Sequence, residues 1–246
     1  MLTRKQVLVT LAAGAVGVAA FVTVMVVLAP QLLTAGSGDG DGRPPYAAPA
    51  PLPPLSTAPT LPGTAGMPDA DWVATTSAAT GIPERALAAY AGAALQEAQL
   101  SPECGIGWNT LAAIGKVESD HGRHDGSSVA ANGTVTPAIY GVPIGDDTDK
   151  GAVDGTAKND RAAGPMQFTP ESWASWATDA NGDGTLDIQN LDDSAMSAAN
   201  YLCRASGELV TQPGWRAAIA AYNSAPSYAV AVASAANKYA KAAADD

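Results

Sequence analysis

A carboxylate near the end of an apolar helix is the residue with the clearest capacity for chemistry. Glu118 lies in the segment Ile114-Gly-Lys-Val-Glu-Ser-Asp-His-Gly122 and shares a helical face with Leu111 and Ile114, the face that a globular helix buries. Gly122 is a natural helix stop, so Glu118 falls in the last turn. Burial and the negative helix end both disfavour ionisation, so Glu118 could donate a proton as a general acid. A solvent-facing glutamate at a helix end is the alternative.

A second signal is the acidic stretch from Asp179 to Asp187, in which oxygen-bearing residues alternate around Gly184 as in an EF-hand loop. The candidate ligands are Asp179, Asn181, Asp183, Thr185 through its carbonyl, and Asp187. Oxygen ligands without histidine or cysteine favour Ca²⁺ over zinc. The loop departs from the EF-hand pattern at position 12, where Asn190 replaces a bidentate glutamate, although Asp192 and Asp193 lie just beyond. A solvated acidic turn is the alternative.

Two shorter motifs carry polar groups next to apolar anchors. Arg161-Ala-Ala-Gly-Pro-Met-Gln-Phe168 precedes a helix start at Thr169-Pro170. Ala220-Ala-Tyr-Asn-Ser224 puts a tyrosine and an amide at a helix end, where they could hydrogen-bond a sugar or simply pack and cap the helix. Each motif taken alone is compatible with a purely structural role.

Composition restricts the class of partner. The chain has 246 residues and a formal net charge of −11, with a pI near 4.4. This acidity argues against nucleic acid, because a phosphate backbone requires a basic surface. The two cysteines, Cys104 and Cys203, are too few and too far apart for a metal site and predict one disulfide in an oxidising compartment. Two buried free thiols are the alternative.

The N-terminal third predicts a tether. Arg4 and Lys5 precede an uncharged run from Val7 to Ala29 that is long enough to span a bilayer. The basic flank predicts a cytoplasmic N-terminus with the rest of the chain outside, and hence a membrane protein with an extracytoplasmic C-terminal domain. We expect an uncleaved signal anchor over residues 1–36, with cleavage and secretion as the alternative. Residues 37–69, rich in Pro, Ala and Gly, predict an extended, disordered linker.

Helical periodicity and helix-ending residues organise the remainder, residues 70–246, into an all-α domain. The expected helices cover residues 71–80, 84–100, 108 to the Glu118 segment, 170–177, 194–205, 215–221 and 227–244. Residues 122–163 lack such periodicity and contain loop chemistry, for example Asn132-Gly133. A loop of this length inside a compact domain is usually functional or an insertion. No clear alternating strand pattern is present.

Together, in this order, the four motifs resemble the lytic transglycosylases of the lysozyme-like superfamily, most closely the membrane-bound lytic murein transglycosylase B type in its actinobacterial form. The resemblance covers about residues 70–246 and implies a lysozyme-like helical fold that acts on peptidoglycan glycan strands. By position it makes Glu118 the catalytic acid and places the substrate-binding residues Ser119, Gln167, Tyr222 and Asn223 in the glycan cleft. It also implies an extended calcium loop closed by Asp193, and no organic cofactor.

The expected reaction cleaves the β-1,4 bond between N-acetylmuramic acid and N-acetylglucosamine without water and forms 1,6-anhydromuramic ends. Two alternatives remain open: a lysozyme-type hydrolase of the same fold, and a non-catalytic wall-binding module. The sequence indicates neither endo nor exo action, and it identifies no protein partner.

Overall fold

The computed structural model describes residues 45–245. The predicted signal anchor and the first part of the predicted linker, residues 37–44, lie outside this range. Within residues 45–245, none of the helices combines the length and the apolar composition needed to cross a bilayer.

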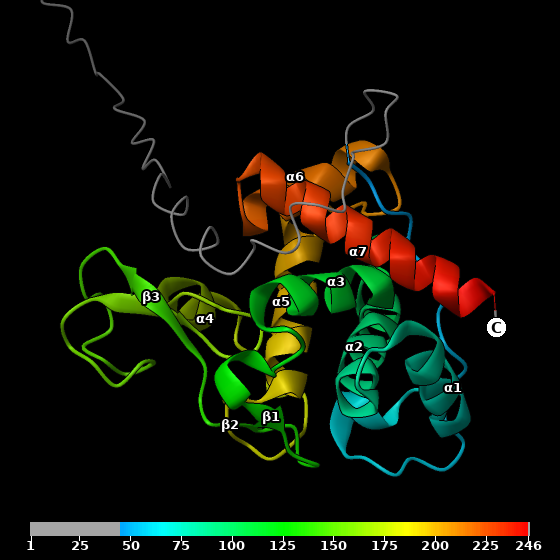
Figure 1. Ribbon diagram of the computed structural model, residues 1–246, viewed down its shortest axis with the longest axis horizontal. Helices are drawn as coiled ribbons and strands as arrows, with labels where there is room; N and C mark the ends of the chain where they lie inside the picture. The colour runs from blue at the N-terminus through cyan, green and yellow to red at the C-terminus, as the bar shows by residue number, and fades with distance from the viewer. Residues whose placement is uncertain (1–44, 246) are drawn as a thin grey trace, which may run out of the picture.

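Helices dominate the described part of the chain (Figure 1). They are α1 (Ala70–Thr80), α2 (Glu84–Leu100), α3 (Trp108–Ser119), α4 (Pro170–Trp176), α5 (Leu191–Ser206), α6 (Gln212–Tyr222) and α7 (Pro226–Ala244), with short 3₁₀ turns η1 (Gly63–Gly66) and η2 (His124–Gly126). Every predicted helix is present. α5 begins three residues earlier than expected because the Asn190 side chain caps it by accepting from the Asp192 backbone N–H.

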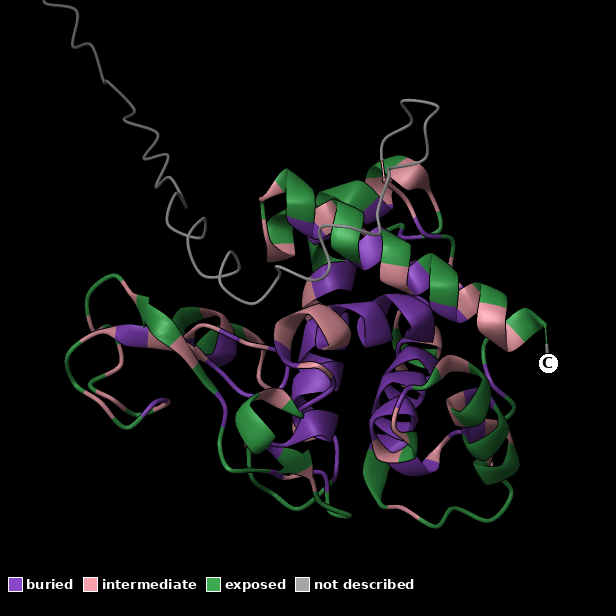
Figure 2. Cartoon of the chain, in the orientation of Figure 1, coloured by how far each residue is buried: buried purple, intermediate pink, exposed green. Residues whose placement is uncertain are grey.

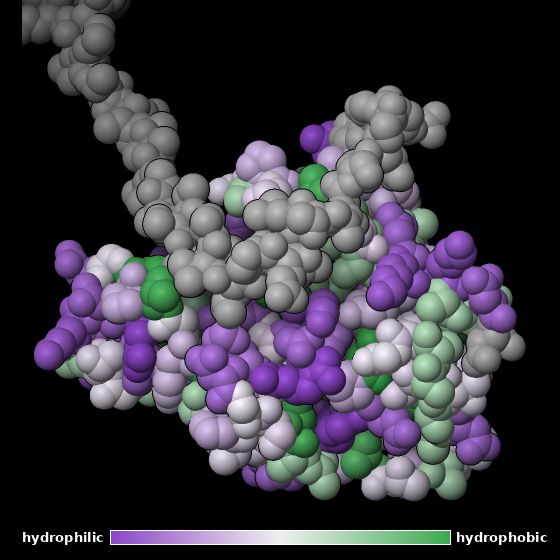
Figure 3. Space-filling model, in the orientation of Figure 1, coloured by the Kyte–Doolittle hydropathy of each residue, from purple (hydrophilic) through white to green (hydrophobic). Residues whose placement is uncertain are grey.

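The core lies where α2, α3 and α5 meet. α3 packs along α7, and α2 packs against both α5 and α3. In Figure 2 most of α2, α3 and α5 is buried, whereas α6 and α7 have both buried and exposed faces. The absence of a side chain at Gly92 on α2 allows η1 to pack closely against this helix. A Cβ at Gly92 would lie 2.0 Å from the Thr64 carbonyl oxygen. Figure 3 shows hydrophilic and weakly apolar residues intermixed over one face.

The segment from Gly122 to Ala163, predicted as a loop, contains two small antiparallel strand pairs. They are β1 (Ser128–Val129) with β2 (Val135–Thr136), and β3 (Tyr140–Ile144) with β4 (Asp160–Ala163). The prediction without strands is therefore wrong in detail, while the helical class holds. The Arg161 guanidinium lies 4.7 Å from the Tyr140 ring centroid across the β3–β4 pair, which projects with α4 from one side of the helices (Figure 1).

Residues 45–69 contact the helical domain, which corrects the prediction of a disordered linker for this part of the segment. Ala47 and Ala50 are buried in the core. The Asn109 side chain on α3 donates to the Ala48 carbonyl and accepts from the Ala50 backbone N–H, with both hydrogen bonds 2.9 Å long. Trp108 Nε1 donates to the Pro51 carbonyl at 3.1 Å. We call residues 45–51 the N-terminal strap.

The disulfide prediction is confirmed: Cys104 and Cys203 are joined with an S–S distance of 2.01 Å. The bond links the turn between α2 and α3 to the last turns of α5. It therefore ties the segment that begins the Glu118 helix to the helix that follows the acidic loop.

Candidate active site

Glu118 lies in the last turn of α3, as predicted, and its carboxylate contacts the first turns of α7. The Tyr228 hydroxyl donates a hydrogen bond of 2.5 Å to Glu118 Oε1. Burial raises the pKa of Glu118 from 4.5 to about 7, and the hydrogen bond from Tyr228 opposes this rise. The alternative of a solvent-facing glutamate does not hold. A side chain with this pKa is substantially protonated at neutral pH and can donate a proton.

Tyrosines surround this carboxyl. The rings of Tyr228 and Tyr222 stack with centroids 6.5 Å apart and an interplanar angle of 9°. The Tyr222 hydroxyl donates to the Met166 carbonyl at 2.7 Å, which fixes the end of α6 against the turn that carries Gln167. Tyr222 was predicted from its motif, whereas Tyr228 was not singled out, because nothing in its local sequence shows which face of α7 meets Glu118.

Ser119 connects the end of α3 to the turn before Gln167. Its hydroxyl donates to the Pro165 carbonyl at 2.6 Å and accepts from the Gly122 backbone N–H at 2.8 Å. The residue is 3% exposed. A role in positioning Glu118 therefore fits Ser119 better than the predicted direct contact with substrate.

The chain leaves α3 through two non-glycine residues in the left-handed region, Asp120 with φ 52° and His121 with φ 61°. The helix thus ends before Gly122, the residue predicted to stop it. Buried His121 lies between the hydroxyls of Tyr90 and Tyr239, 3.4 Å from Nδ1 and 3.0 Å from Nε2. Burial lowers the pKa of His121 to about 3, so the imidazole is neutral. This anchor holds the backbone beyond Glu118 in its strained conformation.

A cleft of about 470 Å³ brings three predicted residues together: Gln167, Tyr222 and Asn223. Gln167 has φ 52°, and its Nε2 donates to the Gly164 carbonyl at 2.9 Å. The Asn223 side-chain oxygen accepts from the Ala225 backbone N–H at 3.0 Å, within the turn that connects α6 to α7. Glu118 is not among the residues that line the cleft, but its neighbour Tyr222 lines it and so connects the two.

In the acidic loop, the side chains accept hydrogen bonds from backbone N–H groups of the loop itself. Asp179 accepts from the backbone N–H groups of Gly182 and Gly184 at 2.8 and 2.9 Å. Asp183 accepts from the Thr185 N–H at 2.8 Å, and Asp187 accepts from the Gln189 N–H at 2.9 Å. The side-chain oxygen of Asn181 accepts from the Asp183 N–H at 2.9 Å. The polar side chains of the loop are therefore hydrogen-bonded to backbone N–H groups of the same loop.

Asp193 reaches this loop from α5. It is fully buried, and its carboxylate accepts from the N–H groups of Ala180 and Asp187 at 2.8 and 3.1 Å. Burial raises its pKa to about 6. By contrast, the Asp192 carboxylate forms a two-pronged ion pair with Arg85 at 2.7 and 2.5 Å. Of the two acids beyond the loop, Asp193 therefore contacts the loop backbone, whereas Asp192 pairs with Arg85.

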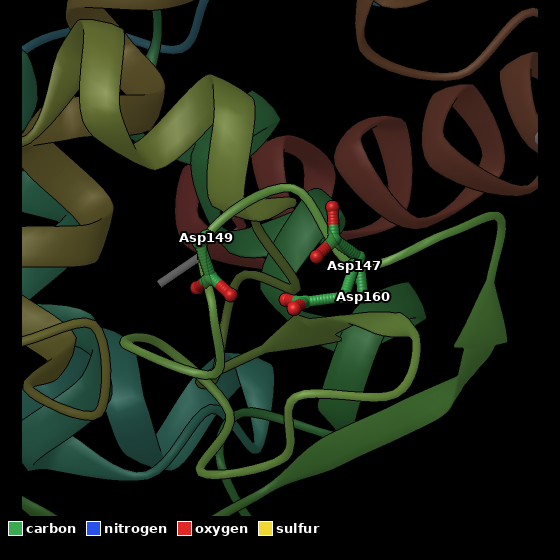
Figure 4. A group of neighbouring side chains, drawn as sticks. All are labelled: Asp147, Asp149 and Asp160. Carbon is green, nitrogen blue, oxygen red and sulfur yellow. The ribbon is translucent and has the colours of Figure 1, made fainter.

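A further acidic group was missed by the sequence reasoning. Asp147 and Asp149, from the connection between β3 and β4, face Asp160 at the start of β4, and the three carboxylates lie within 4.8 Å of one another (Figure 4). Asp160 accepts from the Thr148 backbone N–H at 2.9 Å, and Asp149 accepts from the Val153 N–H at 2.7 Å. These hydrogen bonds account for the grouping as loop structure.

A family profile described as the transglycosylase SLT domain matches residues 83–215. Among solved structures, that of the Escherichia coli lytic transglycosylase Slt35 in complex with bulgecin A is similar, with a TM-score of 0.42 and 17% identity over 71% of this chain and 74% of that chain. The comparison with curated proteins found no match.

Proposed function

The chain belongs to the transglycosylase SLT domain family and is a peptidoglycan lytic transglycosylase, and on this premise we propose that it cleaves the β-1,4 bond between N-acetylmuramic acid and N-acetylglucosamine with formation of 1,6-anhydromuramic ends. The observation that carries the proposal is the Glu118 carboxyl at the end of α3, which accepts a hydrogen bond from Tyr228 and has its pKa raised to about 7 by desolvation. Membership of this enzyme family argues against the alternative of a non-catalytic wall-binding module.

In the proposed mechanism Glu118 acts twice. Its proton passes to the glycosidic oxygen as the bond from that oxygen to C1 of the muramoyl residue breaks, leaving positive charge on C1. The acetamido group of the same sugar can stabilise this charge, as in substrate-assisted glycosidases. The C6 hydroxyl then attacks C1, and the ionised Glu118 takes its proton. The anhydro ring closes without water, and Glu118 is again protonated.

The charge environment of the neighbouring acids supports a one-carboxylate mechanism. Asp120 is paired with Lys116 and lies 3.1 Å from Arg123, and hydrogen bonds and charge from these two cations lower its pKa. Asp125 is 87% exposed at its side chain and pairs with His124. Hydrolysis by the lysozyme route requires a second carboxylate that acts as base or nucleophile, and neither acid is placed for that role.

Product mass separates the proposed reaction from hydrolysis. Digestion of purified peptidoglycan by the full-length chain in ¹⁸O-labelled water should release muropeptides that are lighter than hydrolysis products by one water and carry no label. Reducing-end muramic acid that carries ¹⁸O would establish a hydrolase instead.

Tyr228→Phe should shift the alkaline limb of the pH–rate profile to higher pH. Glu118 donates a proton only while protonated, so the rate falls as pH rises through its pKa of about 7. The Tyr228 hydroxyl stabilises the ionised carboxylate and lowers that pKa, so its removal raises the pKa. The measurement is the pH at which kcat/KM falls to half its maximum.

Tyr239→Phe is the matched control for this shift. It removes a phenol hydroxyl from the same helix, but the partner of Tyr239 is His121 rather than Glu118. Its alkaline limb should stay in place. An unmoved or lowered limb in Tyr228→Phe would contradict the assigned hydrogen bond.

We further propose that the acidic loop binds a structural calcium ion through Asp179, Asn181, Asp183, Thr185, Asp187 and Asp193. The donors are all oxygens, as calcium prefers. The ion pairs among the described residues do not include Asp193, whose buried carboxylate therefore lacks a compensating side-chain cation. Asn190 and Asp192 are committed to the α5 cap and to Arg85, which favours Asp193 as the closing ligand.

Calcium at about 10 mM should raise the melting temperature by roughly 3–10 °C, since binding at a hundredfold excess over Kd stabilises by about 2.7 kcal/mol and extracellular EF-hand-type sites bind with Kd of about 10⁻⁴–10⁻³ M. Asp183→Ala should abolish the rise. Asp147→Ala, which alters the other acidic group, should retain it. Identical melting curves in excess chelator and in calcium would leave the loop as an acidic turn only.

For the N-terminal region we propose that residues 1–36 anchor the domain outside the cytoplasmic membrane. The support is the basic flank before the apolar run and the Cys104–Cys203 disulfide, a bond typical of exported proteins. Carbonate extraction of membranes separates the two outcomes: an anchored chain stays in the pellet, and a cleaved one is released.

A further inference from the structure

A second hollow of about 530 Å³ lies beside the disulfide, between the end of α2, the end of α4 and the last turns of α5. Both polar and apolar groups line it. The side chains that define its chemistry are Glu97, Glu103, Trp176, Asn200 and Arg204. The mechanism proposed above uses none of these residues, and no motif in the sequence pointed to them.

Glu97 in this hollow is a buried acid, and one of its two carboxylate oxygens lacks a hydrogen-bond partner within the protein. The residue is 2% exposed, and its Oε2 makes no hydrogen bond within the protein. Burial raises the pKa of Glu97; the Glu103 carboxylate adds to the rise, and the Ser101 hydroxyl opposes it. A buried carboxylate oxygen without a partner is costly, and native proteins rarely retain one without a use.

The second hollow adjoins the cleft that contains Gln167 and Tyr222. Ser175 and Trp176, at the end of α4, line both cavities, so this helix end forms the partition between them. A branch attached to a glycan chain in the cleft would therefore have to extend only past α4 to enter the second hollow.

The chemistry of the hollow selects for an amine. An ammonium group would satisfy the unpartnered Glu97 oxygen and relieve the repulsion between Glu97 and Glu103. Exposed Arg204 lines the same hollow and suits a carboxylate on the same ligand. Peptidoglycan carries such a branch, because the peptide stem on the muramoyl residue contains amino acids with free amino and carboxylate groups.

We propose that the hollow around Glu97 binds the free ammonium group of a peptide stem while the glycan lies in the cleft. This inference rests on the proposed function, since it assigns the hollow to the same substrate. It makes Glu97 a determinant of substrate preference and not of the chemical step.

The test compares three substrates with the full-length chain: glycan strands with intact stems, the same strands with acetylated stem amines, and strands stripped of stems by an amidase. Wild type should have a KM about tenfold lower on intact stems than on the other two, as expected for one charged hydrogen bond. Glu97→Gln should raise KM about tenfold on intact stems only, with kcat unchanged. Glu84→Gln, an exposed change on the same helix, should alter nothing.

Glu103→Gln provides a second variant, at an exposed residue, should Glu97→Gln fail to fold; it should produce the same selective rise in KM. Calorimetry with free stem peptide separates this inference from the proposed function. Peptide binding that is lost in Glu97→Gln and on amine acetylation supports it even if no substrate is cleaved. Equal KM values on all three substrates, or absence of peptide binding to the wild type, overturn it.

Discussion

Glu118→Gln should lower kcat for the cleavage of peptidoglycan by at least about 10³-fold and leave the fold intact. General acid–base assistance is worth about 10²–10⁴-fold per role, and one residue here fills both roles. Glutamine keeps the shape of the side chain and can still contact the Tyr228 hydroxyl, but it cannot supply or take up the protons that the proposed mechanism requires. The measurement is single-turnover cleavage of purified peptidoglycan.

The same variant should be more stable than the wild type at pH 8 and equal to it at pH 4. The folded-state pKa of Glu118 is raised from 4.5 to about 7, so its unfavourable contribution is absent below pH 4.5 and complete above pH 7. A difference of that size corresponds to about 3 kcal/mol. Glu84→Gln should change neither activity nor stability. Activity of Glu118→Gln within about tenfold of wild type would remove Glu118 from its assigned role.

Loss of the disulfide should cause the largest change in stability. Cys104 and Cys203 are 99 residues apart, and closing a loop of about 100 residues stabilises by about 4–5 kcal/mol in the chain-entropy model. Cys104→Ala with Cys203→Ala should therefore lower the melting temperature by about 10–20 °C. Alanine is chosen because both positions are buried.

Chemical reduction supplies the control for that prediction. A reductant should lower the melting temperature of the wild type to that of the double variant, and it should leave the double variant unchanged. A drop of less than about 3 °C on removal of both cysteines would indicate that the loop is already constrained in the unfolded chain.

The helical part of the fold could be predicted because its signals are local. Asp69 caps α1 and Gly81 ends it in the left-handed region, and apolar spacing marks the buried face of α2. β1 and β2 could not be predicted because each has two residues, too few to show an alternation. α3 ends before Gly122 because His121 is anchored between two tyrosines from distant helices, a cause that no local pattern contains.

In the candidate site, too, residues within local motifs could be predicted and those placed by long-range packing could not. The Glu118 segment, Gln167 and the Tyr222-Asn223 pair were identified from motifs. Tyr228, which donates a hydrogen bond to the Glu118 carboxyl, was missed because this contact depends on how α7 packs along α3. The N-terminal strap was missed for a different reason: it is held largely by its backbone carbonyl and amide groups, which every sequence has, rather than by large apolar side chains.

The attachment of the N-terminal strap gives the domain a defined mechanical pathway. Its hydrogen bonds reach Trp108 and Asn109 in the first turn of α3, and the Tyr46 carbonyl accepts from Asn237 on α7. α3 carries Glu118 and α7 carries Tyr228. Tension applied at residue 45 would therefore act on the two helices that hold the acid and its hydrogen-bond donor, and through Tyr46 also on Val210 and on Trp215 of α6. Under the proposed anchoring, pulling on the N-terminal segment would strain the contact between Glu118 and Tyr228.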